Sequence, residues 1–164
     1  MQAVCRDAVP EDFAAILAIN RESVPGVAPL DRAYFGLLVR VCEHARVVEL
    51  DGVVAGYIFA MSGDAAYSGE EFQWFRRHLS GKFLYVDQIA IRGSCRGMGL
   101  GKALYEGLKD HAGRIAVSVL ACEVNHDPPN DESRAFHRRM GFREVSRMDT
   151  RGTTVSLLTT GASD

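Results

Sequence analysis

The chain has 164 residues, of which 47% are hydrophobic and 24% charged, so it can bury one hydrophobic core and we expect a single domain over residues 1–164. Its formal net charge of -2 and pI near 6.2 argue against broad binding to nucleic acid or to a membrane surface. No run of roughly eighteen apolar residues and no apolar leader is visible, so the sequence predicts a cytoplasmic protein without a membrane partner.

A short strand is expected at Met1 to Arg6, and two helices follow it. The first helix begins at Pro10, since proline is favoured in a first helical turn. The second is capped by Asp31 and continues to Val41. The segment Ser23 to Pro29 between them carries two prolines and a glycine, so it is irregular, and such segments often line a binding cleft.

The strongest hairpin signal lies in the middle of the chain, where Asp51-Gly52 joins Arg46 to Leu50 with Val53 to Met61. A short helix over Glu70 to Leu79 is expected as an insertion between strands. The aromatic residues of this helix are expected to pack in the fold, with a substrate wall as the alternative. Exposed aromatic residues at Tyr67, Phe72 and Trp74 would suit a homodimer contact.

A strand at Phe83 to Ile91 leads into a glycine-rich loop at Arg96 to Lys102 and then into an amphipathic helix. Alternate glycines let the backbone amides of such a loop approach a ligand closely. The helix N-terminus and the flanking cations add positive potential. This stretch therefore predicts a cradle for a diphosphate.

Two better-known nucleotide motifs do not fit this loop. A P-loop would need a glycine where Arg96 stands and a hydroxyl where Ala103 stands. A dinucleotide fingerprint would need a glycine at Lys102 or Leu104. A nucleotide-binding domain is thus only the third hypothesis for the function, after the two given at the end of this section. Metal binding is not expected either, because the four cysteines lack C-x-x-C spacing and paired histidines.

The C-terminal part predicts a buried strand at Arg114 to Val124, parallel to the strand before the glycine loop through a right-handed crossover. Asn125 to Asp131 is expected to be irregular because it contains two prolines. A helix then runs to Met140, and two strands follow at Arg143 to Asp149 and Thr153 to Thr159. The expected fold class is α/β, with a mixed, mostly antiparallel sheet, one parallel strand pair and flanking helices.

Two motifs in this order resemble those of the GNAT superfamily of N-acetyltransferases. The pattern Q/R-x-x-G-x-G/A is met by Arg96, Gly99 and Gly101. A second signature is met by Asn130, Ser133, Phe136 and Gly141-Phe142. The expected order of elements covers nearly the whole chain.

The resemblance implies acetyl-CoA as the acyl donor and assigns residues to its binding. The pantetheine arm would pair with the backbone of the strand before the loop, at Ile89, Ala90 and Ile91. The pyrophosphate would lie on the loop and the start of its helix, at Arg96, Gly97, Met98, Gly99, Leu100, Gly101, Lys102 and Ala103. The other side of the arm would be formed by Asn130, Ser133, Phe136 and His137.

For catalysis, the resemblance implies direct transfer without a metal, helped by a backbone amide near Ile89 or Ile91. His137 stands where the family often has a tyrosine, and it is either the acid for the leaving thiolate or only a packing residue. Asp87 is the first candidate base, expected on the same strand face as Tyr85 and the two isoleucines, and Glu123 is the second. A chain of water molecules could replace either carboxylate.

The predicted function is transfer of an acetyl or other acyl group from acetyl-CoA to an amine of a small molecule or a peptide. The alternative is a non-catalytic acyl-CoA sensor or interaction domain that kept the cradle and lost the chemistry.

Overall fold

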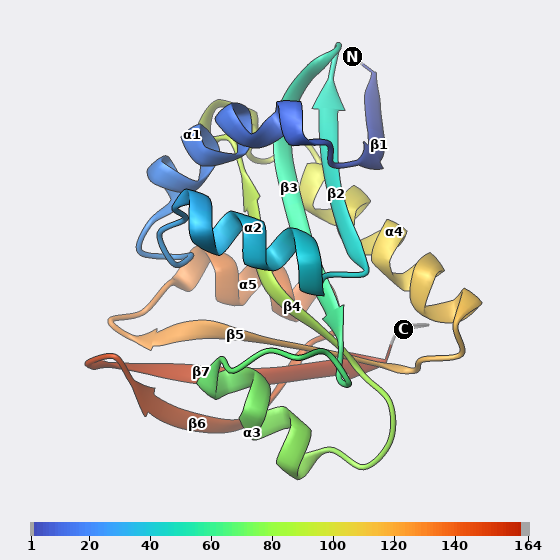
Figure 1. Cartoon of the computed structure of the whole chain (residues 1–164). Helices are drawn as coiled ribbons and strands as arrows, with labels where there is room; N and C mark the ends of the chain where they lie inside the picture. The colour runs from blue at the N-terminus through green and yellow to red at the C-terminus, as the bar shows by residue number, and fades with distance from the viewer. Residues whose placement is uncertain (1, 162–164) are drawn as a thin grey trace.

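One mixed sheet of seven strands, in the order β1-β2-β3-β4-β5-β7-β6, organises the computed structural model, which describes residues 2–161 (Figure 1). The strands are β1 Ala3–Asp7, β2 His44–Leu50, β3 Val53–Ser62, β4 Leu84–Ile91, β5 Val119–Asp127, β6 Arg143–Thr150 and β7 Thr153–Gly161. The helices are α1 Phe13–Ser23, α2 Arg32–Val41, α3 Glu70–His78, α4 Leu100–Arg114 and α5 Asp131–Arg139. Only β4 and β5 pair in parallel among these neighbours, which confirms the predicted fold class.

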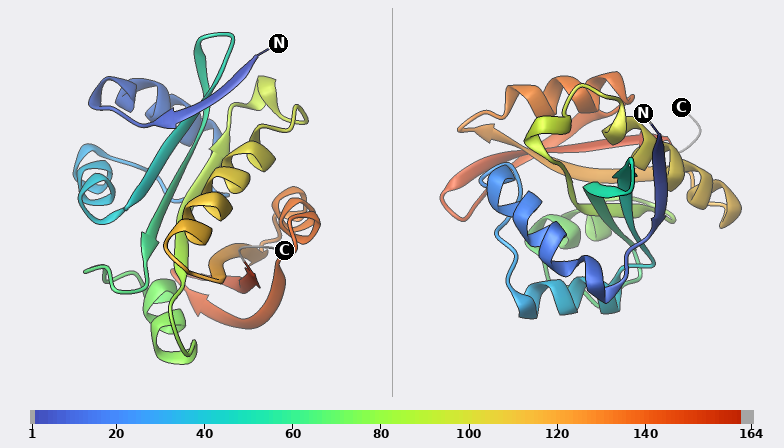
Figure 2. Two further views of the ribbon diagram at one scale, coloured as in Figure 1. Left: turned by 90° about the vertical axis from the view of Figure 1, so that its right-hand side faces the viewer. Right: turned by 90° about the horizontal axis from the view of Figure 1, so that it is seen from above.

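Helices cover both faces of the sheet and define two apolar clusters (Figure 2). On one face, α4 contributes Leu104 and Leu108, and α5 packs Phe136 beside them. On the other face lie α1, α2 and α3, which contribute Ile16, Leu38 and other apolar side chains. The sheet is therefore buried from both sides, as its long apolar runs indicate.

Both predicted hairpins are present, and their turns have the backbone that short hairpins favour. Asp51 and Gly52 have φ of 51° and 85°, and Arg151 and Gly152 have φ of 51° and 77°. Positive φ at both central residues matches the right-handed twist of the strands they join. The first strand, expected from Met1, is found at Ala3–Asp7; Met1 lies outside the described residues.

The predicted start of the fifth strand at Arg114 is wrong. α4 continues to Arg114, and the Val117 amide donates to the Ala112 carbonyl at 2.8 Å, so the apolar run after the helix closes its C-terminus. The strand extends to Asp127 instead, so Asn125–Asp127 are not irregular as predicted. The apolar pattern of the sequence cannot distinguish a strand from the end of a helix that is followed by a buried apolar residue, here Val117.

The aromatic residues near α3 mainly pack in the core, as predicted, and the exposure assumed for a dimer contact is wrong for Phe72. Phe72 is fully buried between α3 and the sheet, where its ring meets Tyr85 edge-on. Tyr67 and Trp74 are half-buried, and Trp74 stacks on His78. These rings build the core beneath the insertion rather than a free surface.

A β-bulge in β4 changes which side chains share a face. Gln88 pairs with Phe59 and Val86 with Ala60, so Asp87 is an extra residue opposite β3. As a result, Asp87 lies on the face of Tyr85, whereas Ile89 and Ile91 pack in the opposite cluster. The predicted common face of Asp87 and the two isoleucines is therefore wrong, because strict alternation fails at the bulge.

Candidate active site

The parallel strands β4 and β5 separate soon after they meet. They pair only at Leu84 with Leu120 and at Tyr85 with Ala121. Farther along β4, the Arg92 amide donates to the Ala55 carbonyl of β3 at 2.7 Å. In an antiparallel pair, every second residue bonds to the neighbouring strand, so the residues between these point their amide and carbonyl groups the other way. The backbone groups of Ile89 and Ile91 therefore face away from β3. The edge of β4 toward β5 is thus open for an extended ligand.

The glycine-rich loop has the backbone that the sequence predicts. Gly97 and Gly99 have φ of 78° and 79°, which only glycine adopts without strain. α4 begins directly after Gly99, and Ala103 is the first residue whose amide bonds back along the helix, to the Gly99 carbonyl at 3.1 Å. The preceding amides are therefore available to an anion.

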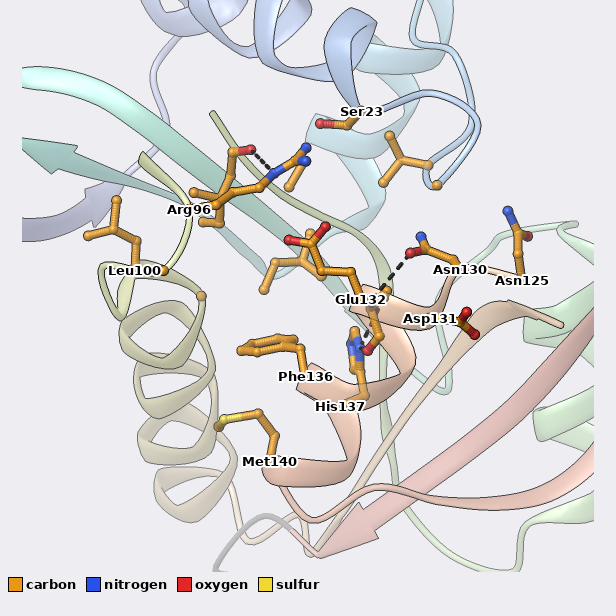
Figure 3. A pocket seen from close by; sticks show the side chains of 18 of the residues that line it. Ser23, Arg96, Leu100, Asn125, Asn130, Asp131, Glu132, Phe136, His137 and Met140 are labelled. Atoms are coloured by element: carbon orange, nitrogen blue, oxygen red, sulfur yellow. Dashed lines mark hydrogen bonds between the residues drawn. The ribbon is translucent and has the colours of Figure 1, made fainter. Parts of the chain in front are cut away.

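α5 forms the opposite wall of the same space. Asn130 caps this helix by accepting a hydrogen bond from the Ser133 amide at 3.2 Å. Figure 3 shows Phe136 on α5 and Met140 just after it pointing toward α4, with Phe136 nearer the start of that helix. The approach is close, since a Cβ added to Gly101 would lie 2.9 Å from Phe136 Cζ. Gly101 thus fixes how near α5 can come to the cradle.

Loop, strand edge and α5 enclose a pocket of about 970 Å³, large enough for a cofactor-sized ligand. Nearly all residues expected to bind acetyl-CoA line this pocket: Ile89, Ala90, Ile91, Arg96, Gly97, Gly99, Leu100, Gly101, Lys102, Asn130, Ser133, Phe136 and His137. Met98 and Ala103 do not line it, and the Met98 side chain is exposed. The positive-φ glycines, the open amides and the apolar α5 wall fit the diphosphate and the pantetheine arm.

The α1–α2 loop forms the third wall, which the sequence predicted as a cleft lining. Pro25, Gly26 and Val27 line the pocket. The Pro25 carbonyl accepts from Asn125 Nδ2 at 3.0 Å, so the loop is tied to the end of β5. Ser23 in Figure 3 marks where α1 enters this wall.

Asp87 and Glu123 lie outside the lining of this pocket, at the point where β4 and β5 part. Asp87 accepts hydrogen bonds from Tyr34 Oη at 2.6 Å and Tyr67 Oη at 2.7 Å. Glu123 accepts one from Tyr85 Oη at 2.6 Å. Continuing the register of Tyr85 with Ala121 by two residues puts the two carboxylates across from each other on one face of the sheet.

Burial and mutual repulsion govern the charge of these carboxylates. Burial raises the pKa of Asp87, and the two tyrosine hydrogen bonds oppose the rise. Burial raises the pKa of Glu123 well above the usual range, and the nearby Glu71 and Asp87 raise it further. Both groups are therefore weaker acids than in water, and Glu123 the more so.

Sequence reasoning missed the side chains that surround these carboxylates. Tyr34 comes from α2 and Tyr67 from the loop before α3, far apart in the chain. Glu71 on α3 is buried and pairs with Arg151 of the β6–β7 turn. No local pattern marks such partners, since only the tertiary fold brings them together.

His137 does not present a free ring nitrogen to the pocket. Its Nδ1 lies 2.8 Å from the Ser133 carbonyl oxygen, so this nitrogen carries the proton, and Nε2 accepts from Tyr105 Oη at 2.8 Å. The side chain is buried, and burial lowers the pKa of the imidazole, which favours the neutral form. The geometry therefore favours the packing role over the acid role for His137.

Among the described residues, no group of three or more histidine, cysteine, aspartate or glutamate side chains is arranged to hold a metal ion. Within the same part of the chain, no helix is both long and apolar enough to cross a membrane.

An anion cradle beside an open strand edge is the arrangement that an acyl-CoA-dependent transferase requires, and two carboxylates of raised pKa lie near the place where the strands part. The chain belongs to the acetyltransferase (GNAT) family, whose model matches residues 13–142. It is thus an N-acetyltransferase that takes the acetyl group from acetyl-CoA and gives it to an amine, which confirms the predicted class and acyl donor.

Comparisons with individual proteins agree with this family and this fold. An uncharacterized N-acetyltransferase of Methanocaldococcus jannaschii is 30% identical over 136 residues, which are 82% of this chain and 74% of that protein. Ard1 from Thermoplasma volcanium has a similar structure, with a TM-score of 0.76 at 20% identity over 97% of each chain. Naa50 of Arabidopsis thaliana, solved in complex with the bisubstrate analogue CoA-Ac-MVNAL, gives 0.73 at 12% identity over 97% of this chain and 98% of that one. The two structures are similar to this chain in fold.

Proposed function

We propose that the protein acetylates a primary amine of a small molecule or a peptide, with Glu123 as the general base. Acetyl-CoA supplies the activated thioester carbonyl. The Ile89 amide faces the open edge of β4, so it can polarise that carbonyl, and the loop amides at residues 97–102 hold the diphosphate. The observation that carries the proposal is the pair of carboxylates where β4 and β5 part.

Glu123 is favoured over Asp87, the first choice from sequence, for a geometric reason. Both carboxylate oxygens of Asp87 accept a tyrosine hydrogen bond, whereas Glu123 uses Oε2 for Tyr85 and leaves Oε1 for the substrate. A base acts best when its pKa approaches the working pH, and the raised pKa of Glu123 moves in that direction. Asp87 then binds and orients the incoming ammonium group by its charge.

The proposed reaction is a direct transfer of the acetyl group from sulfur to nitrogen. Glu123 takes a proton from the bound ammonium group, and the lone pair that this frees attacks the thioester carbonyl to form the new C–N bond. The Ile89 amide stabilises the oxyanion, and the C–S bond then breaks with its electron pair on sulfur. The nitrogen releases its second proton to solvent as the amide forms, and solvent protonates the thiolate, because both ring nitrogens of His137 are already engaged. No covalent enzyme intermediate is needed.

The acceptor could be a peptide terminus, as in the CoA-Ac-MVNAL analogue bound to Naa50, or a small amine. The experiment is to incubate the protein with acetyl-CoA and a panel of small amines and short peptides. Released CoA thiol and acetylated product are then measured together. For at least one acceptor, acetylated product and CoA thiol are expected in equal amounts. Release of thiol without acetylated product, with every acceptor in the panel, would contradict the proposal.

The same assay addresses the alternative of a non-catalytic acyl-CoA sensor, which would bind acetyl-CoA and release no thiol with any amine. The tyrosine usual for the family is absent, which favours that alternative, while the two carboxylates favour catalysis. The single domain, the homodimer and the cytoplasmic location stay predictions from the sequence.

A further inference from the structure

A buried polar network lies beneath the α1–α2 loop, in a region where the neighbouring side chains are apolar. Asn20 on α1, Tyr57 on β3 and Gln88 on β4 are 1%, 0% and 2% exposed. Tyr57 Oη donates to Gln88 Oε1 at 2.7 Å, and Asn20 Nδ2 lies 3.1 Å from the same oxygen. A helix face that also carries the buried Ile16 and Ile19 would pack more simply with another apolar residue at Asn20.

The network bonds to the loop through its backbone. The Ala28 carbonyl accepts from Asn20 Nδ2 at 2.9 Å and from Gln88 Nε2 at 3.0 Å. The Leu30 amide donates to Asn20 Oδ1 at 3.0 Å. Each amide side chain is thus held in one orientation by a donor and an acceptor group. The loop cannot move relative to α1 and β4 without breaking these hydrogen bonds.

Both ends of this connection are parts of the site. The loop residues just before Ala28 line the pocket, through Pro25, Gly26 and Val27. Gln88 lies between the bulge residue Asp87 and the Ile89 amide that faces the thioester. One side chain therefore links the wall of the site to the strand that carries its reactive groups.

We propose that Asn20 and Gln88 are positioning residues that hold the α1–α2 loop at the distance from β4 that acceptor binding requires. This inference rests on the proposed function, because the loop and β4 flank the pocket in which the amine has to meet the thioester. Misplacing a wall by a small distance is enough to lower the rate of a reaction that depends on orientation.

The test uses Gln88→Met, which keeps the length of the side chain and removes its donor and acceptor. The KM for the acceptor found with the amine panel should rise about tenfold or more, in line with the loss of buried hydrogen bonds. The dissociation constant for acetyl-CoA should rise by a smaller factor than the acceptor KM, since the amides of the diphosphate cradle do not contact the network, although the loop lines the same pocket. Gln88→Glu should recover part of the loss, because the protonated form of a carboxyl at this position can still donate to the Ala28 carbonyl.

Two further variants separate positioning from stability. Tyr57→Phe removes one phenol from the network and should raise the acceptor KM less than Gln88→Met does. Val117→Ala truncates a buried side chain after α4, far along the chain from the loop, and should lower the melting temperature with the acceptor KM unchanged.

An acceptor KM for Gln88→Met equal to that of the wild type, with only the melting temperature lowered, would overturn the positioning role and leave the proposed function intact. A wild-type protein that acetylates no amine would overturn both.

Discussion

At the scale of single residues, Asp87 and Glu123 are both candidate bases from the sequence, but their carboxylates have different surroundings. Asp87 is held by two tyrosines and Glu123 by one. Two neighbouring acids whose environments differ in this way are expected to differ in role. We therefore propose Glu123 before Asp87, the reverse of the order predicted from the sequence, in which neither the tyrosines nor the bulge leaves a local signal.

Glu123→Gln should lower kcat by about 100-fold, the usual contribution of a general base, while acetyl-CoA still binds. Burial raises the pKa of Glu123, and only the carboxylate form can take a proton. In the wild type, kcat/KM for the acceptor should therefore be lost as pH falls through that raised pKa, and the variant should lack this limb of the profile. A pH profile of Glu123→Gln that falls as the wild type's does would assign the base elsewhere.

His137→Phe should change stability more than chemistry. The variant removes the imidazole acceptor of the buried Tyr105 Oη and leaves only the weaker Cys122 thiol as its partner, which costs about 1–3 kcal/mol in unfolding free energy. Adding Tyr105→Phe should recover much of that loss, because both polar partners are then gone. Denaturant unfolding of the single and double variants measures this, and a kcat for His137→Phe lowered more than about tenfold would restore the acid role.

At the scale of elements, the position of α5 against α4 depends on one glycine. Gly101→Ala should destabilise the protein by about 1 kcal/mol and weaken acetyl-CoA binding, because its Cβ would press on the Phe136 ring. Gly107 in the same helix is the matched control, since a Cβ there meets no atom within 4 Å. Gly107→Ala should stabilise the helix by about 0.5–1 kcal/mol and leave binding unchanged. Equal effects from the two variants would contradict this account of the α4–α5 contact.

Elements with strong local signals were predictable, and those set by tertiary contacts were not. The turns at Asp51-Gly52 and Arg151-Gly152 and the cradle at residues 97–102 follow from glycine chemistry that the sequence displays. The start of β5 was missed because the apolar residue Val117 serves the end of α4 instead. The bulge at Asp87 was missed because a strand that alternates in sequence gives no sign of an inserted residue.

At the scale of the whole molecule, the separation of β4 from β5 unites the parts of the site. Pairing stops after Tyr85 and Ala121, so the open strand edge, the diphosphate cradle and the two carboxylates meet where the strands part. The parallel pair and the crossover were predicted from element order, which is why the class of enzyme could be read from the sequence. The identity of the acceptor could not, because the walls beside the carboxylates come from α2, α3 and the β6–β7 turn.

The assignment of the pocket to acetyl-CoA is tested most simply by the melting temperature of the wild type and of Gly99→Glu, each measured with and without acetyl-CoA. At 100 times its dissociation constant, a ligand stabilises the folded state by about 2.7 kcal/mol, or roughly 5–10 °C for a chain of this length. The wild type should show such a rise and Gly99→Glu none, because this substitution places a long acidic side chain in the positive-φ turn of the cradle. An equal rise in both proteins, or no rise in the wild type, would contradict the assignment of this pocket to acetyl-CoA.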